Sequence, residues 1–216
     1  MYDFWAIFLL AFIFLIVFFI GSNKNKKLSI KYAKAIKEYM TPHSEFIGFK
    51  PFGYSGFRSF CRLKKENAFD KIEIAIALID RENLMHYPLS FITKEYDRFV
   101  CWGFLKNKIP SNIEIFQKID KKNYEKIILE KKLKEIVIEE EKELKESYIF
   151  LTDDVNFAEK ILLKPEIKEN LLNMKKFIKR LSLNKEESWI YLIAELKEEA
   201  LKPLLNLILD FGKALS

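Results

Sequence analysis

Cysteine, glycine and proline are scarce in this chain, and each scarcity excludes a class of protein. The 216 residues include two cysteines, Cys61 and Cys101, which are too few for a disulfide framework and lack the spacing of a zinc site. Six glycines and six prolines exclude a collagen-like or linker-like chain. Half of the residues are hydrophobic and 20 are phenylalanine, so long disordered stretches are not expected. We expect a folded protein from a reducing compartment.

Sequence motifs of catalysis are also missing. The chain has no glycine-rich phosphate loop, no HExxH motif and no nucleophile elbow. His43 and His86 are far apart in the sequence, and both cysteines fall in expected strands, where buried structural thiols are usual. The adjacent Asp153 and Asp154 fit a helix cap better than an acid pair. We predict no enzyme activity, no cofactor and no metal site; an enzyme acting at a membrane surface is the less favoured alternative.

The longest apolar run lies near the N-terminus. Residues 4–20, FWAIFLLAFIFLIVFFI, contain no charged or polar side chain. At about 1.5 Å per residue the run spans about 26 Å, and with Tyr2, Gly21 and Ser22 about 30 Å, the thickness of a bilayer core. We predict one transmembrane helix within residues 1–22. The side chains expected inside the membrane include Phe4, Trp5, Phe8, Phe12, Leu15, Phe19 and Ile20.

Positive charge follows this run instead of preceding it. Residues 23–38 hold six lysines against one glutamate, whereas Asp3 is the only charged side chain in residues 1–22. A cleaved signal peptide, the competing interpretation, has its basic residues before the apolar run and a small-residue cleavage site after it. Because lysine-rich flanks stay in the cytoplasm, we predict an N-terminus outside the cell membrane and residues 22–216 inside.

Residues 23–40 have the pattern of a basic amphipathic helix. Apolar side chains recur at helical spacing on one side: Leu28, Tyr32, Ala33, Ile36, Tyr39 and Met40. In one interpretation the helix lies near the lipid headgroups, with Lys24, Lys26, Lys27, Lys31 and Lys34 at the membrane surface. In the other, its apolar stripe packs on the domain. Both can hold, since the faces differ. Charge concentrated here suits membrane lipid, and no DNA binding is expected.

Residues 41–216 predict a cytoplasmic α+β domain of mixed α/β order with antiparallel strands. Alternating and β-branched runs predict strands at 45–49, 57–64, 71–79, 97–105, 148–151, 177–183 and 188–196. Helices are expected at 152–163, 166–176 and 200–215, and a partly helical crossover at 81–93, broken at Pro88. The charged segment 106–146 marks an optional division into two lobes. Within it, 113–119 and 135–139 resemble edge strands, with a helix over 121–146 as the alternative.

Pro203 lies within the apolar pattern of the closing amphipathic helix. A proline inside a helix removes a hydrogen bond and costs about 3 kcal/mol unless it lies in the first turn. The helix therefore either begins near Leu201, which we favour, or is kinked at Pro203.

Two segments, IGSNKNKKLSIKY (20–32) after the apolar run and EALKPLLN (199–206) in the expected closing helix, stand near the ends of the chain. They resemble the calumin family, the coiled-coil subunit of the PAT intramembrane-chaperone complex: the first is similar to the segment that follows the family's membrane helix, and the second to its closing helix with an internal proline. Between them FIGF (46–49), FCRLKK (60–65) and ALIDRENL (77–84) match weakly in the same order. The chain lacks the family's acidic lumenal region and its C-terminal coiled coil, so calcium buffering is not carried over. The short form suggests an archaeal relative.

The resemblance implies a non-enzymatic accessory factor for the insertion and folding of multipass membrane proteins at the Sec translocon. The implied partners are an Asterix-like small membrane protein, the translocon, the ribosome and client transmembrane segments. The ribosome contact is open, because the coiled coil is missing. A membrane-anchored scaffold is the alternative function. The closing helix is the candidate partner helix, through Leu201, Pro203, Leu204, Leu205, Asn206 and Ile208.

Overall fold

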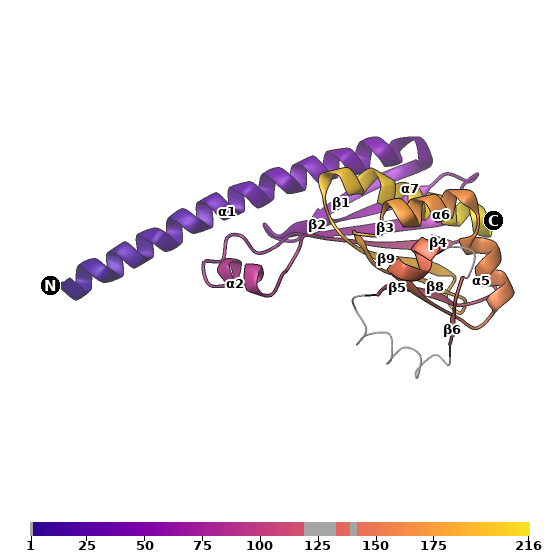
Figure 1. Cartoon of the computed structure of the whole chain (residues 1–216). Coiled ribbons are helices and arrows are strands. Elements are labelled where there is room, and N and C mark those ends of the chain that lie inside the picture. Colours follow the sequence, from indigo (N-terminus) through magenta and orange to yellow (C-terminus); the bar gives the residue numbers. More distant parts are fainter. Residues whose placement is uncertain (1, 119–132, 139–141) are drawn as a thin grey trace.

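A single long helix and a sheet with helices packed on it make up the protein (Figure 1). The computed structural model describes residues 2–118, 133–138 and 142–216, with side chains from Trp5 onward. All strand pairs are antiparallel. The expected α+β class is confirmed.

The first helix, α1 (Tyr2–Met40), runs without a break through both segments that the sequence divides, 1–22 and 23–40. It ends before Pro42, because proline has no N–H to bond the Glu38 carbonyl and its ring crowds that carbonyl, and a short 3₁₀ turn follows at Thr41–His43. Tyr32, Ile36 and Met40 are buried in the core. The second half of α1 therefore packs on the domain, while the first half projects from it (Figure 1).

The sheet has nine strands in the order β1-β2-β3-β4-β9-β8-β5-β7-β6. Their bounds are β1 (Ser44–Pro51), β2 (Gly56–Leu63), β3 (Phe69–Ala77), β4 (Arg98–Leu105), β5 (Ile113–Gln117), β6 (Lys134–Ile136), β7 (Tyr148–Thr152), β8 (Ile178–Asn184) and β9 (Trp189–Glu195). Alternate side chains of the central strands form the core, as a sheet with one buried face requires. On β3 these are Ile72, Ile74 and Ile76.

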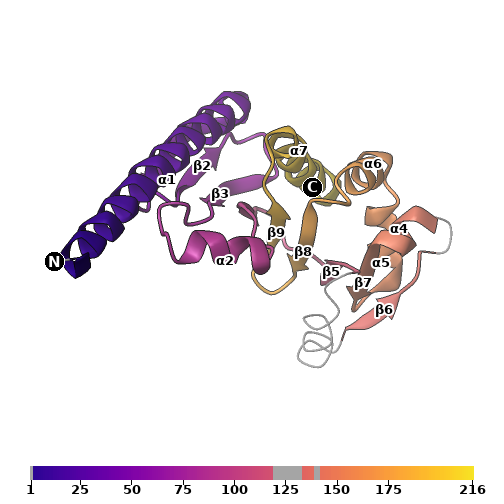
Figure 2. The ribbon, with the colours of Figure 1, turned by 60° about the vertical axis from the view of Figure 1, so that its left-hand side comes forward.

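Helices cover this buried face. They are α4 (Lys142–Ser147), α5 (Val155–Leu162), α6 (Pro165–Asn173) and α7 (Glu198–Leu215), while the short α2 (His86–Ile92) lies apart from them (Figure 2). α7 lies beside the second half of α1. Tyr39 donates a hydrogen bond of 3.1 Å to Asn206, and Lys31 pairs with Glu198 at 2.5 Å.

Three local predictions are wrong. β5 lies between β8 and β7, not at an edge, because Glu114 is buried against Arg180 at 3.1 Å instead of facing water. Pro88 does not break α2; it occupies the first helical turn, where its missing N–H has no helical partner to lose. α7 begins at Glu198, so Pro203 lies inside it and removes the bond to the Glu199 carbonyl.

A single sheet contains strands from both sides of segment 106–146, where the sequence allowed a division into two lobes. β4 pairs with β9, and β8 then pairs with β5, so strands from both halves alternate across the sheet. β6 forms the edge that the sequence predicts near 135–139. Most of the alternative helix 121–146 lies outside the described residues; within them, 142–147 is helical.

Candidate functional site

The exposed half of α1 is long and apolar enough to cross a membrane. Among the described residues it is the one helix with these properties, and 11% of its apolar window is buried, unlike the core helix of a soluble protein. Of the side chains expected in the membrane, Phe4 lies outside the described side chains. The others are exposed: Trp5, Phe8, Phe12, Leu15, Phe19 and Ile20.

A buried polar cluster joins α1 to the domain just after this apolar segment. Asn25 is fully buried, and its amide donates to the Ile79 carbonyl at 2.9 Å and to Glu82 at 2.8 Å. Arg81 donates to the Asn25 amide oxygen at 2.9 Å and holds Asp97 through two bonds of 2.9 and 2.8 Å. We call Asn25, Ile79, Arg81, Glu82 and Asp97 the junction cluster. Every polar atom of Asn25 is thus satisfied, as burial requires.

Gly21 brings the helix backbone close enough for this cluster to form. A Cβ atom at this position would lie 2.2 Å from the Arg81 carbonyl oxygen, well inside van der Waals contact. Glycine normally weakens a helix interior by up to about 1 kcal/mol relative to alanine. Here it permits close contact between α1 and residues 79–82. The angle between the apolar segment and the domain is fixed by this contact and by the junction cluster.

The junction cluster unites two segments that are distant in the sequence, 20–32 and 77–84. The lysines of residues 23–38 predict a basic surface, and this pattern does not reveal that Asn25, between Lys24 and Lys26, is buried. The available signal was a glycine, a serine and two asparagines within one helical stretch.

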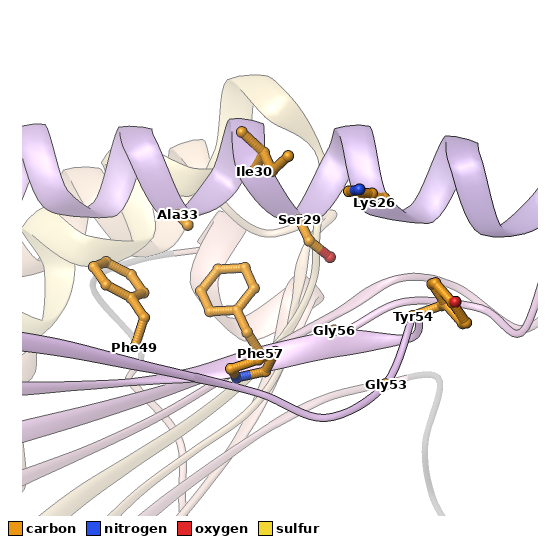
Figure 3. A pocket seen from close by; sticks show the side chains of 10 residues that line it. Lys26, Ser29, Ile30, Ala33, Phe49, Gly53, Tyr54, Gly56 and Phe57 are labelled. Atoms are coloured by element: carbon orange, nitrogen blue, oxygen red, sulfur yellow. The ribbon is translucent and has the colours of Figure 1, made fainter.

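An apolar groove of about 350 Å³ lies between α1 and the β1–β2 hairpin. Figure 3 shows the rings of Phe49 and Phe57 directed from the strands toward α1, with centroids 5.8 Å apart. The helix contributes Lys26, Ser29, Ile30 and Ala33, and the hairpin adds Pro51, Gly53, Tyr54 and Gly56. The volume is at the lower end of ligand-binding pockets.

The hairpin turn closes toward the apolar segment of α1. Gly56 has φ +144°, and a Cβ there would lie 1.9 Å from the Ile76 carbonyl oxygen, so this position requires glycine. The turn directs Tyr54 onto Phe18, with centroids 5.8 Å apart in an edge-to-face arrangement. The groove therefore lies directly beside the end of the apolar segment.

The five lysines predicted for a membrane surface are all exposed: Lys24, Lys26, Lys27, Lys31 and Lys34. α1 continues through this region as one unbroken helix. Each residue therefore lies about 1.5 Å farther from Ile20 along the helix axis than the residue before it. Lys24 to Lys27 lie about 6–11 Å beyond Ile20, and Lys34 about 21 Å beyond it. The continuous helix carries the last two lysines away from the end of the apolar segment.

The candidate partner helix is part of the core, and that prediction needs correction. Leu201, Leu204, Leu205 and Ile208 are at most 2% exposed. Asn206 accepts from Tyr39 and donates to Asp210 at 3.0 Å. Pro203 alone is neither buried nor held by such a bond. The apolar face that the sequence assigned to a partner packs on α1 and the sheet.

Within the described residues no group of three His, Cys, Asp or Glu side chains could hold a metal ion. Cys61 and Cys101 are buried, and burial raises the pKa of both thiols. Asp154 caps α5 by accepting from the Phe157 N–H at 3.1 Å, which confirms the predicted cap.

No protein-family model matches this chain, and no curated protein does. Its function has to be inferred from its own residues.

Proposed function

We propose that this protein is a single-pass, non-enzymatic accessory factor that holds an apolar segment of another membrane protein during insertion or folding. The apolar half of α1 is the anchor, with its N-terminus outside the cell membrane and the domain in the cytoplasm. The observation that carries the proposal is the groove between α1 and the β1–β2 hairpin, which opens beside the end of the anchor.

The height of the groove defines its occupant. Lys26 and Ala33, at its two ends, lie about 9 and 20 Å beyond Ile20 along α1. The headgroup layer extends about 5–8 Å from the hydrocarbon core. Because Tyr54 also lines the groove and contacts Phe18, the groove opens at the headgroup layer and continues above it along α1, where an apolar segment that has not yet entered the bilayer is exposed to water.

The groove suits transient binding. Burial of one large apolar side chain contributes about 1.5–3 kcal/mol, and association itself costs about 4–15 kcal/mol. A groove that accepts a few side chains therefore binds a segment weakly and releases it, as an insertion factor must.

The direction of the anchor is supported by Lys24, Lys26 and Lys27, which follow it closely and remain exposed. Its retention, instead of cleavage as a signal sequence, is supported by the burial of Gly21, Ser22 and Asn25 against the domain. Cleavage near residue 22 would remove the contact between Gly21 and Arg81.

Site-specific photocrosslinking from native membranes tests the proposal. A photoreactive residue at Ile30, in the groove, should form adducts with apolar segments of membrane proteins. The same residue at Glu38, exposed on α1 outside the groove, should not. Equal adducts at both positions would contradict a role for the groove.

A substitution pair gives the matching functional test. Phe49→Asp places a charge in the groove and should abolish the Ile30 adducts, whereas Phe46→Asp, on the same strand outside the groove, should preserve them. Affinity purification of the full chain should recover translocon subunits and an Asterix-like small membrane protein, as the calumin resemblance implies. Recovery of neither would leave a membrane-anchored scaffold as the function.

A further inference from the structure

Four large apolar side chains project into solvent from one short segment of the domain. Met85, Leu89, Phe91 and Ile92 are 70%, 52%, 69% and 78% exposed. All four lie on or beside α2, and we call them the α2 patch. Exposure this high of adjacent apolar side chains marks a surface that is covered in the functional state.

The α2 patch lies at the height of the anchor's inner end. Residues 79–82, which lead into α2, are bound to Asn25, and the Arg81 backbone packs on Gly21. In both views α2 lies at the end of the domain from which the apolar half of α1 projects (Figure 1 and Figure 2). The hairpin tip reaches the same end, where Tyr54 contacts Phe18.

Ser90 is the buried side chain of α2, 2% exposed, and it donates to the Tyr87 carbonyl at 2.6 Å. The segment that carries α2 is tied down on both sides, because Arg81 binds Asp97 at 2.8 Å and His86 pairs with Glu95 at 3.4 Å. α2 is thus held close to the domain and presents apolar groups on its exposed side. A short helix with this division suits the boundary between headgroups and acyl chains.

We propose that the α2 patch inserts into the cytoplasmic leaflet beside the anchor, so that the protein contacts lipid at two places. This inference rests on the anchoring given under the proposed function. Lipid is the occupant because the junction cluster fixes α2 beside the end of a helix that lipid already surrounds. Two contacts fix the rotation of the domain about the anchor, which one helix cannot do, and thereby fix the direction in which the groove opens.

Depth-dependent quenching in vesicles tests the insertion. Cys61 and Cys101 are 1% and 0% exposed, so a fluorescent thiol reagent labels only an introduced cysteine on the folded full chain. Three variants carry the label: Ile92→Cys in the patch, Phe12→Cys in the anchor, and Glu186→Cys in the exposed β8–β9 turn. Quenchers are phospholipids with a nitroxide either near the headgroup or near the end of the acyl chain.

The fluorescence of the label at position 92 should be blue-shifted and should be quenched most by the nitroxide near the headgroup. The label at position 12 should be quenched most by the nitroxide near the end of the acyl chain. The label at position 186 should be quenched by neither. A label at 92 that behaves like that at 186, while that at 12 is quenched, overturns the α2 insertion and leaves the anchor intact. A label at 92 that is shielded from water but unquenched also overturns it, because a protein contact then covers the patch. An unquenched label at 12 overturns the anchor itself, and with it the proposed function.

A charge substitution separates insertion from folding. Met85→Asp with Phe91→Asp should reduce quenching at position 92 to the level at 186. Phe46→Asp, an equally exposed apolar position on β1, should leave quenching at 92 unchanged. Equal loss in both variants would contradict a specific role for α2.

Discussion

At the scale of single residues, the structural role of Asn25 is larger than the sequence around it suggests. It lies between two lysines, yet its amide connects α1 to residues 79 and 82 of the domain. A polar side chain in a basic helix normally faces water, and nothing local distinguishes Asn25 from its exposed neighbour Asn23. Its partners are more than 50 positions away, so its burial could not be predicted from periodicity.

The two asparagines provide a matched test of the junction cluster. Asn25→Ala removes the hydrogen bonds to the Ile79 carbonyl and Glu82 and the one from Arg81, and should destabilise the protein by about 1–3 kcal/mol. For a chain of this size the unfolding midpoint should fall by roughly 2–12 °C. Asn23→Ala should change stability by less than about 0.5 kcal/mol.

Thermal unfolding of the full chain in detergent micelles, followed by tryptophan fluorescence, measures both variants. Equal midpoints for the two alanine variants would show that the hydrogen bonds of Asn25 do not stabilise the junction.

At the scale of elements, α1 is one continuous helix, whereas the sequence predicts two helical segments, 1–22 and 23–40. The apolar stripe predicted for 23–40 is confirmed by the burial of Tyr32, Ile36 and Met40. The interpretation that this helix lies near the lipid headgroups stays a prediction; the structure adds that the helix continues unbroken from the apolar segment. Gly21, Ser22 and Asn23 are residue types that often end or begin a helix, but here the glycine serves close packing on Arg81 and the helix continues through it.

In the proposed membrane arrangement, the position of each lysine along α1 determines its contact with lipid. Lys24, Lys26 and Lys27 lie about 6–11 Å beyond Ile20, close to the Debye length of about 8–10 Å. Replacing these three with Gln should weaken the preference for anionic over zwitterionic lipid, by up to about 1 kcal/mol per lysine. The same change at Lys34, Lys37 and Lys202, which are exposed but farther along, should have little effect.

Electron paramagnetic resonance of spin-labelled anionic lipid around the reconstituted chain measures this preference. The orientation should be preserved in both variants, because the first leaves three lysines in residues 23–38 and the second leaves four. The measured quantity is the fraction of anionic lipid whose motion is restricted by contact with the protein. If Gln at Lys34, Lys37 and Lys202 reduced this fraction as much as Gln at the three lysines closest to Ile20, the upright arrangement of α1 would be contradicted.

Strands and helices with clear alternation were predicted within a few residues, and their failures have a common cause. Glu114 suggested a charged edge, but it is fully buried and accepts hydrogen bonds from Arg180 and Ser182 on β8. A charged residue predicts an exposed position unless a partner on a distant strand pairs with it, and the sequence alone does not identify such a partner. The groove was not predictable for the same reason, since Phe49, Phe57 and Ile30 meet only after α1 and the hairpin pack together.

At the scale of the whole molecule, the pairing of β4 with β9 unites the two halves of the chain. Trp102 lies opposite Tyr191 in this pair, with ring centroids 5.2 Å apart, although the residues are far apart in the sequence. The optional division into lobes depended on charge density in 106–146, which says nothing about which strands pair. With one sheet and a shared core, the domain should unfold as one cooperative unit.

Leu192, fully buried on β9, tests this cooperativity, because it lies in the strand that joins the halves. Leu192→Ala should destabilise the domain by about 2–5 kcal/mol. Native-state hydrogen exchange should then accelerate by the same factor in β2 and β3 as in β7, since all three open in one transition. Ile193→Ala, on the half-buried opposite face, should have a smaller effect of the same pattern. Acceleration confined to β7 and β8, with β2 and β3 unchanged, would mean that two lobes unfold separately and that the groove is stabilised by the N-terminal half alone.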